Sequence, residues 1–241
     1  MPSRWSHSAW PVAAVALAVA FVAWLGTRVA LQPPGDFDAR ILLALRDPGD
    51  PAALRGPHWL FAAMRDITAL GDTPVITLVT AIVAGFALAR RRIAEAAFIA
   101  FTVASGAIID TQLKLAFARP RPGLVPHLVE VTSASFPSGH AMNSAVVCLT
   151  IGVLIASHTP DRDTRLYAAV VALALTLVIG ASRVYLGVHY PTDVIGGWVA
   201  GAAWAMACWL VAARWLGIAD RNPAPGGALP LAVHPAKPRR P

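Results

Sequence analysis

Charged residues are scarce in this chain, and their scarcity narrows the classes of protein it can be. Asp, Glu, Lys and Arg make up 14% of its 241 residues, against about 25% in an average soluble domain. Apolar residues reach 56%, and the mean hydropathy is +0.59. This composition excludes a solvent-exposed globular enzyme and an intrinsically disordered chain, and it indicates a protein whose solvent is lipid.

Cysteine is nearly absent, and basic residues outnumber acidic ones. Cys148 and Cys208 each lie within an apolar run without a partner at metal-ligand spacing, so we expect two buried thiols and no disulfide. The net charge of +7 could suggest nucleic acid, but the Lys and Arg residues lie in short loops between apolar runs. That distribution is typical of membrane topology, and we expect no nucleic-acid partner.

Six apolar runs are long enough to cross a bilayer as helices, because a span needs about 17–20 residues. The first run could be taken for a signal peptide, but it is long and lacks a clear small-x-small cleavage site, so we expect an uncleaved span. The predicted fold is therefore an all-α integral membrane bundle of six transmembrane helices. The runs cover residues 9–31, 73–89, 93–113, 139–157, 166–181 and 191–213.

Positive charge predicts the orientation of the bundle. The short turn Arg90-Arg91-Arg92, between the second and third runs, should be cytoplasmic. Both termini are then cytoplasmic, and the loops 28–72, 114–138 and 182–193 lie outside. High Ala, Arg and Pro usage with short loops suggests a bacterium. We therefore expect an inner-membrane protein whose outer loops face the periplasm.

The long outer segment and the C-terminal tail differ from the spans. Within residues 32–72, apolar residues recur at helical spacing around 37–45 and 60–70, with prolines between them. This pattern predicts two amphipathic helices at the membrane interface. Residues 220–241 are rich in Pro and Gly, and we predict a disordered cytoplasmic tail. Residues 1–219 then form one membrane domain.

Polar residues from three separate segments should meet at the outer face. Three of them are cations that can neutralise a phosphate, and arginine offers paired donors to its oxygens. A serine could cap the fourth span, whose first backbone N–H groups would form an anion site. The residues are Lys114, Arg121, Ser138, Gly139, His140, Arg183, His189 and Asp193.

Two histidines and a carboxylate could carry out phosphoryl transfer at such a site. Asp193 could accept the proton of one His189 nitrogen and leave the other free to attack phosphorus. His140 could then protonate the leaving oxygen. Each residue taken singly has a simpler explanation, as a first-turn acid, an interfacial histidine or a helix-end charge. Their joint placement favours a site that works through a phosphohistidine.

Three sequence patterns in this region resemble those of the membrane-bound type-2 phosphatidic acid phosphatases, whose active site is similar to that of vanadium haloperoxidases. The first is Lys, six residues and Arg-Pro, at 114–122. The second is Pro-Ser-Gly-His, at 137–140. The third is Ser-Arg, five residues, His, three residues and Asp, at 182–193. Every specified position matches in order.

The resemblance implies a role for each candidate residue. His189 would be the nucleophile, Asp193 its orienting partner and His140 the general acid. It also implies that neither a metal nor another cofactor is needed, and the sequence has no carboxylate or Cys/His cluster at metal-ligand spacing. The phosphate would be held by Lys114, Arg121, Ser138, Gly139 and Arg183.

The expected substrate is a lipid phosphate of the outer leaflet. Undecaprenyl diphosphate is the first candidate, followed by phosphatidylglycerophosphate and phosphatidic acid. A phosphotransferase that passes the group to another lipid would use the same residues, and product analysis separates the two. A transporter or channel is a third hypothesis, because Glu95 and Asp110 lie within the third run, although both are near its ends. Six spans exclude a soluble haloperoxidase.

Overall fold

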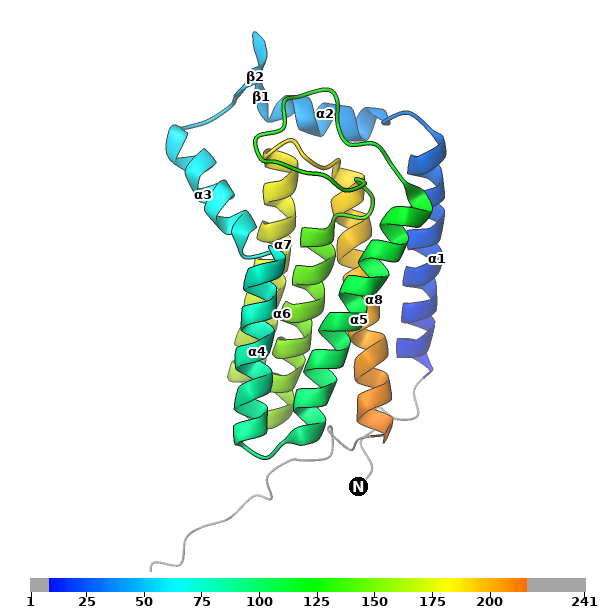
Figure 1. Ribbon diagram of the computed structural model, residues 1–241, viewed down its shortest axis with the longest axis vertical. Helices are drawn as coiled ribbons and strands as arrows, with labels where there is room; N and C mark the ends of the chain where they lie inside the picture. Colours follow the sequence, from blue (N-terminus) through cyan, green and yellow to red (C-terminus); the bar gives the residue numbers. More distant parts are fainter. Residues whose placement is uncertain (1–8, 216–241) are drawn as a thin grey trace, which may run out of the picture.

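The structure, a computed structural model, describes residues 9–215 and is almost entirely helical (Figure 1). Residues 1–8 and 216–241 are not described, so the predicted tail lies outside it. The elements are α1 (Trp10–Leu31), α2 (Asp36–Ala44), β1 (Arg46–Asp47), β2 (Asp50–Leu54), α3 (His58–Ala69), α4 (Thr73–Ala89), α5 (Ile93–Phe117), α6 (Gly139–His158), α7 (Arg162–Tyr185) and α8 (Pro191–Trp215).

Within residues 9–215, five helices are long and apolar enough to span a membrane on their own: α1, α5, α6, α7 and α8. Helix α4 has only 17 residues. It follows α3 at a bend of 53°, and the two helices together are long and apolar enough for a sixth span. The predicted six-span, all-α membrane bundle is confirmed, with α4, preceded by α3, in the place of the second span.

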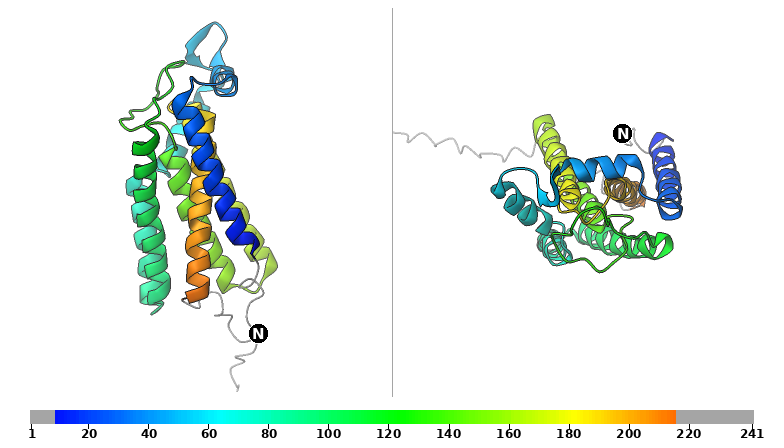
Figure 2. Two further views of the ribbon diagram at one scale, coloured as in Figure 1. Left: turned by 90° about the vertical axis from the view of Figure 1, so that its right-hand side faces the viewer. Right: turned by 90° about the horizontal axis from the view of Figure 1, so that it is seen from above.

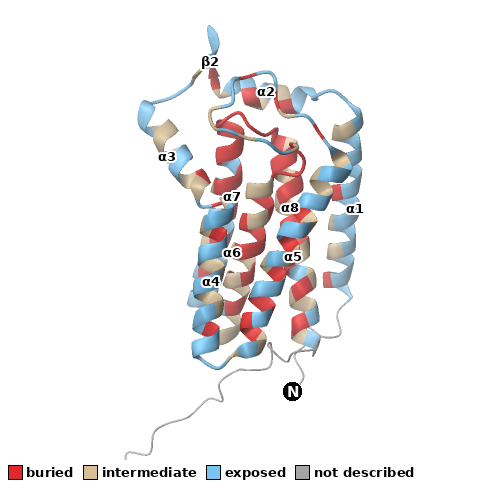
Figure 3. Ribbon diagram, viewed as in Figure 1, coloured by how far each residue is buried: buried red, intermediate tan, exposed pale blue. Residues whose placement is uncertain are grey.

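The bundle packs around α6 and turns apolar side chains outward. Helix α6 lies against α5, α7 and α8, while α1 packs on α8 (Figures 1 and 2). The outer faces of the helices are exposed (Figure 3), and they include large apolar side chains such as Trp24, Phe86 and Phe101. Exposed apolar surface on this scale is unfavourable in water and suits the acyl chains of a bilayer.

The outer segment contains the two predicted helices and one element that was not predicted. Helix α2 lies across the end of the bundle, whereas α3 slants down its side to meet α4 and packs against α7 (Figure 1). Between them, β1 and β2 form an antiparallel hairpin in which Asp47 pairs with Asp50. The Pro48-Gly49 turn joins the two strands, and such a dipeptide is a strong turn signal.

The opposite end of the bundle carries the arginine turn. Arg90–Arg92 join α4 to α5, and Arg91 adopts a positive φ of 58° that a tight reversal requires. Helix α7 begins at the same end, four residues earlier than predicted. Its N-cap residue Asp161 accepts a hydrogen bond from the backbone N–H of Thr164 at 2.7 Å.

Candidate active site

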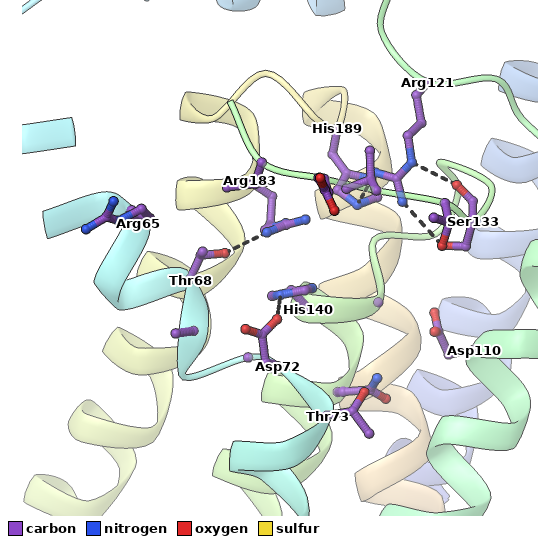
Figure 4. A pocket seen from close by; sticks show the side chains of 18 of the residues that line it. Arg65, Thr68, Asp72, Thr73, Asp110, Arg121, Ser133, His140, Arg183 and His189 are labelled. Atoms are coloured by element: carbon purple, nitrogen blue, oxygen red, sulfur yellow. Dashed lines mark hydrogen bonds and ion pairs between the residues drawn. The ribbon is translucent and has the colours of Figure 1, made fainter. Parts of the chain in front are cut away.

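The structure brings the sequence-predicted residues together at the end of the bundle opposite the Arg90–Arg92 turn; we call this the outer end and the end with the turn the inner end. A cavity of about 600 Å³ opens there, between the α3–α4 junction, the ends of α5, α6 and α7, and the loop that follows α5 (Figure 4). Ser138 and Asp193 are fully buried behind its wall. The predicted residues that line the cavity are Lys114, Arg121, Gly139, His140, Arg183 and His189.

His189 lies in the tight loop between α7 and α8, with 2% of its surface exposed. Gly187 makes this loop possible, because its φ of 77° belongs to the left-handed region. The Nη1 of Arg121 lies 3.2 Å from Nε2 of His189. Since arginine can only donate, Nε2 carries the lone pair and Nδ1 the proton. Burial lowers the pKa of His189 to about 3, so the imidazole is neutral at physiological pH.

Asp193 faces the other nitrogen of His189 from the first turn of α8. Its Oδ2 lies 3.6 Å from Nδ1, which is beyond a direct hydrogen bond. The hydroxyl of Ser135 bridges the gap, lying 3.4 Å from Nδ1 and donating to Oδ2 at 2.5 Å. The backbone N–H of Tyr190 also donates to Oδ2, at 2.9 Å. This arrangement fixes the carboxylate beside the imidazole.

Arg119 and Asp38 hold the opposite side of Asp193, and neither was among the residues predicted from the sequence. Arg119 donates to Oδ1 of Asp193 at 2.5 Å and to Oδ2 of Asp38 at 2.8 Å. All three side chains are at least nine-tenths buried. Asp38 belongs to α2, so this chain of ion pairs ties the outer helix to the site. The doubled Arg-Pro at 119–122 was the signal that could have indicated Arg119.

Each of the three cavity cations is positioned by a neighbour. Lys114 donates to Oδ1 of Asp110 at 2.9 Å and to the carbonyl of Pro137. Arg121 donates to the carbonyls of Ser133 and Val188, each at 2.8 Å. These contacts leave the charge of both side chains at the wall of the cavity, where an anion would meet it.

Arg183 is the third cation of this wall and is held from the α3 side. Its Nη1 donates to Oγ1 of Thr68 at 2.9 Å, while its Nε is buried without a partner among the described residues. The contact joins the end of α7 to the last turn of α3. Arg183 therefore keeps hydrogen-bonding capacity that a phosphate oxygen could use.

The N-terminus of α6 closes the cavity. Ser138 occupies the N-cap position as predicted, but its hydroxyl makes no capping bond and has no partner within residues 9–215. The first N–H groups of α6 point toward the cavity end of the helix, as an anion site requires. A Cβ at residue 139 would lie 2.9 Å from Oδ2 of Asp110, so glycine allows the close approach of α5 and α6 here.

His140 follows in the first turn of α6 and contacts an acid that was not among the residues predicted from the sequence. Its Nε2 lies 2.7 Å from Oδ1 of Asp72, at the junction of α3 and α4 (Figure 4). Asp72 precedes Thr73-Pro74 and looked like an ordinary helix start.

The two acids of the third predicted span, Glu95 and Asp110, lie at opposite ends of α5. Glu95 contacts His158 and Asp110 contacts Lys114, so the two acids form no continuous path through the bundle.

Metal ligation would need a different set of side chains. Among residues 9–215, no group of three or more His, Cys, Asp or Glu side chains could hold an ion. The positive charge around the cavity comes instead from lysine, arginine and a helix N-terminus. Such groups suit phosphate, whose oxygens accept several charge-assisted hydrogen bonds.

Comparisons with known proteins agree with this geometry. The sequence model described as the PAP2 superfamily matches residues 95–216. Phosphatidylglycerophosphatase B of Bacillus subtilis is 33% identical over 151 residues, which cover 62% of this chain and 74% of that protein. An undecaprenyl-diphosphatase of the same organism is 30% identical over 102 residues, covering 39% of this chain and 46% of that protein.

A solved structure extends the likeness to most of the chain. The crystal structure of a transmembrane PAP2-type phosphatidylglycerolphosphate phosphatase from Bacillus subtilis superposes with a TM-score of 0.71 at 27% identity. The match covers 86% of this chain and 98% of that one. The shared part therefore includes the outer segment and the first spans, which the superfamily model does not reach.

Proposed function

This chain belongs to the PAP2 superfamily of membrane lipid phosphatases, and from that premise we propose that it hydrolyses a lipid phosphate through a phosphohistidine on His189. The orientation of the His189 ring is the observation that supports this proposal most directly. Its unprotonated Nε2 faces Arg121 at the cavity, and its Nδ1 faces Ser135 and Asp193. A phosphate drawn to the cavity cations would meet the nitrogen that holds the lone pair.

The reaction takes two steps. Nε2 of His189 attacks phosphorus while the bond to the lipid oxygen breaks, and a proton from His140 neutralises that oxygen. The cations and the N–H groups of α6 stabilise the charge on the three remaining phosphate oxygens. Water, losing a proton to His140, then attacks phosphorus and cleaves the P–N bond. Inorganic phosphate leaves, and His189 regains its lone pair.

We take phosphatidylglycerophosphate as the first substrate to test. The relative named for that activity aligns over about three quarters of its own length, at the highest of the identities reported above. Undecaprenyl diphosphate was the first candidate from the sequence and becomes the second here, because the relative named for that activity aligns over less than half of its own length. Both lipids present a terminal phosphate that the cavity cations could hold.

Phosphate release by purified protein in detergent tests this function. The panel contains phosphatidylglycerophosphate, undecaprenyl diphosphate and phosphatidic acid, with His189→Ala as the blank. Activity should survive EDTA, and vanadate should inhibit, because it adopts the geometry of the transferring phosphoryl group. A second assay with an acceptor lipid detects phosphotransfer. Release no faster than the blank on every lipid would refute the proposal.

We also propose that the site faces the periplasm. The Arg90–Arg92 turn lies at the end of the bundle opposite the cavity, and clustered arginines favour the cytoplasmic side. A single cysteine in the 123–135 loop, in a background without Cys148 and Cys208, should react with an impermeant maleimide in intact cells. A cysteine at 158–165 should react only after lysis. The reverse pattern would contradict the proposed orientation.

A further inference from the structure

The elbow between α3 and α4 supplies one wall of the cavity and contacts two candidate residues. Thr68 receives the hydrogen bond from Arg183 at 2.9 Å, and Asp72 lies 2.7 Å from His140. Figure 4 shows both side chains pointing from the elbow toward the cavity. The elbow lies outside residues 95–216, the stretch that matches the superfamily model. The part of the site that binds His140 is therefore contributed by a different part of the chain.

Asp72 occupies a helix N-cap position without acting as a cap. An aspartate at this position ordinarily accepts a hydrogen bond from a backbone N–H of the first turn. Asp72 has the extended backbone of an N-cap, with ψ of 145°, yet its side chain makes no capping bond to α4. Its Oδ1 contacts Nε2 of His140 instead. Helix capping therefore does not explain the acid at this position.

Gly71 allows the elbow to approach His140. A Cβ at residue 71 would lie 2.9 Å from Cδ2 of His140 and 2.7 Å from Cγ2 of Ile179. The Cδ2–Nε2 edge of the imidazole thus rests against the elbow, with Gly71 beside Cδ2 and Asp72 beside Nε2. Nδ1 lies across the ring from this edge and has no hydrogen-bond partner among the described residues, so it is the nitrogen that a substrate could use.

We propose that Asp72 is the positioning residue that orients His140 and favours its protonated form, the general acid, an inference that rests on the proposed lipid phosphatase activity. The carboxylate accepts the Nε2 proton of the imidazolium and stabilises its charge. The Nδ1 proton passes to the lipid oxygen as the P–O bond breaks, and the bonding electrons stay on that oxygen. Neutral His140 then takes a proton from the attacking water and returns to the imidazolium.

The leaving group provides the test, because a general acid matters most when the departing oxygen is strongly basic. Two substrates with the same alkyl chain are compared: an alkyl phosphate and a 4-nitrophenyl phosphate carrying that chain on the ring. In Asp72→Asn, hydrolysis of the alkyl ester should fall by about 10–100-fold. Hydrolysis of the nitrophenyl ester should fall by less than about threefold, since nitrophenolate leaves without a proton.

Three further variants separate positioning from a structural effect. The double variant Asp72→Asn/His140→Ala should be no slower on the alkyl ester than His140→Ala alone, because Asp72 acts through His140. Asp72→Glu keeps the charge and should restore part of the alkyl ester activity. Asp36→Asn is the control, since Asp36 is exposed on α2 at the same end of the molecule, and it should match the wild type.

Each outcome decides a different question. An equal loss on both esters in Asp72→Asn, or an additive loss in the double variant, would overturn the role of Asp72. If Asp72→Glu lost as much activity on the alkyl ester as Asp72→Asn, the role of Asp72 would also be overturned. A wild-type protein that hydrolyses neither ester nor any lipid of the panel would refute the proposed function instead.

Discussion

The two ends of the bundle carry the same kinds of side chains but use them differently. At the inner end, Asp161 caps α7 through the N–H of Thr164. At the outer end, Asp72 and Ser138 occupy N-cap positions of α4 and α6, yet neither caps its helix. Asp161 thus fills the usual role of a capping residue, whereas Asp72 and Ser138 do not. Departures of this kind mark functional sites, where side chains serve something other than the fold.

Carboxylate–histidine pairs also occur at both ends, and their surroundings differ. His158 lies 3.0 Å from Glu95 at the inner end, where Arg92 is the cation that contacts both. His140 and His189, with their acids, lie instead at a cavity with three cations and a helix N-terminus. An acid beside a histidine is therefore not a catalytic site by itself. The cations and the space for a substrate make the difference.

The largest effect should come from removing the histidine at the outer end. His189→Ala loses the nitrogen that we propose as the nucleophile, so we expect turnover to fall by at least about 10³-fold. His158→Ala removes a histidine with the same kind of acidic neighbour and should keep activity within about twofold. Phosphate release measures both. Comparable losses in the two variants would show that the ends do not differ in function.

The sequence predicted the spans and the residues that meet around the cavity because both depend on short patterns. Long apolar runs fix the helices, and the three motifs fix which side chains reach the outer face. The supports of the site were not predictable in this way. Asp38, Thr68 and Asp72 lie many residues from the side chains they contact, and each looks like an ordinary helix residue until the tertiary structure places it. The 53° bend between α3 and α4 was also not predicted, because Gly71 and Pro74 mark the start of a new helix without setting its angle to the preceding one.

The next effect concerns the brace behind Asp193. Arg119→Gln leaves Asp38 and Asp193 buried without their shared cation, which should destabilise the protein by about 3–5 kcal/mol and displace the partner of His189. The stability of Arg119→Lys should lie between those of Arg119→Gln and the wild type, because lysine keeps the charge but lacks the guanidinium group that contacts both acids. Arg40→Gln, in an exposed pair with Asp36, should change little. The measurements are thermal unfolding in detergent and phosphate release. Equal stability of the Arg119 and Arg40 variants would show that the ion pairs of Arg119 do not stabilise the protein.

A smaller effect should appear as a dependence of stability on pH. Burial lowers the pKa of His189 to about 3, whereas an unfolded histidine titrates near 6.5. As the pH falls from about 6.5 toward 3, the unfolded state takes up a proton that the folded state does not, so stability falls. His189→Gln removes this contribution. Its Tm should therefore decrease less than that of the wild type between pH 7 and 5, and parallel curves would show that His189 does not titrate as its burial implies.

The smallest effect should come from the helix cap at the inner end. Asp161→Ala removes the oxygen that accepts from Thr164, so α7 begins with an unpaired N–H and the Tm should fall by a few degrees. Activity per folded molecule should not change, because α7 is long and its other end, with Arg183, is held separately by Thr68.

Asp72→Ala should show the opposite pattern, since Asp72 makes no capping bond and contacts His140. Its Tm should stay near the wild-type value while phosphate release falls. Thermal unfolding and turnover measured on the same two samples give the result. If Asp161→Ala lost activity and Asp72→Ala lost only stability, the division between a structural inner end and a chemical outer end would be wrong.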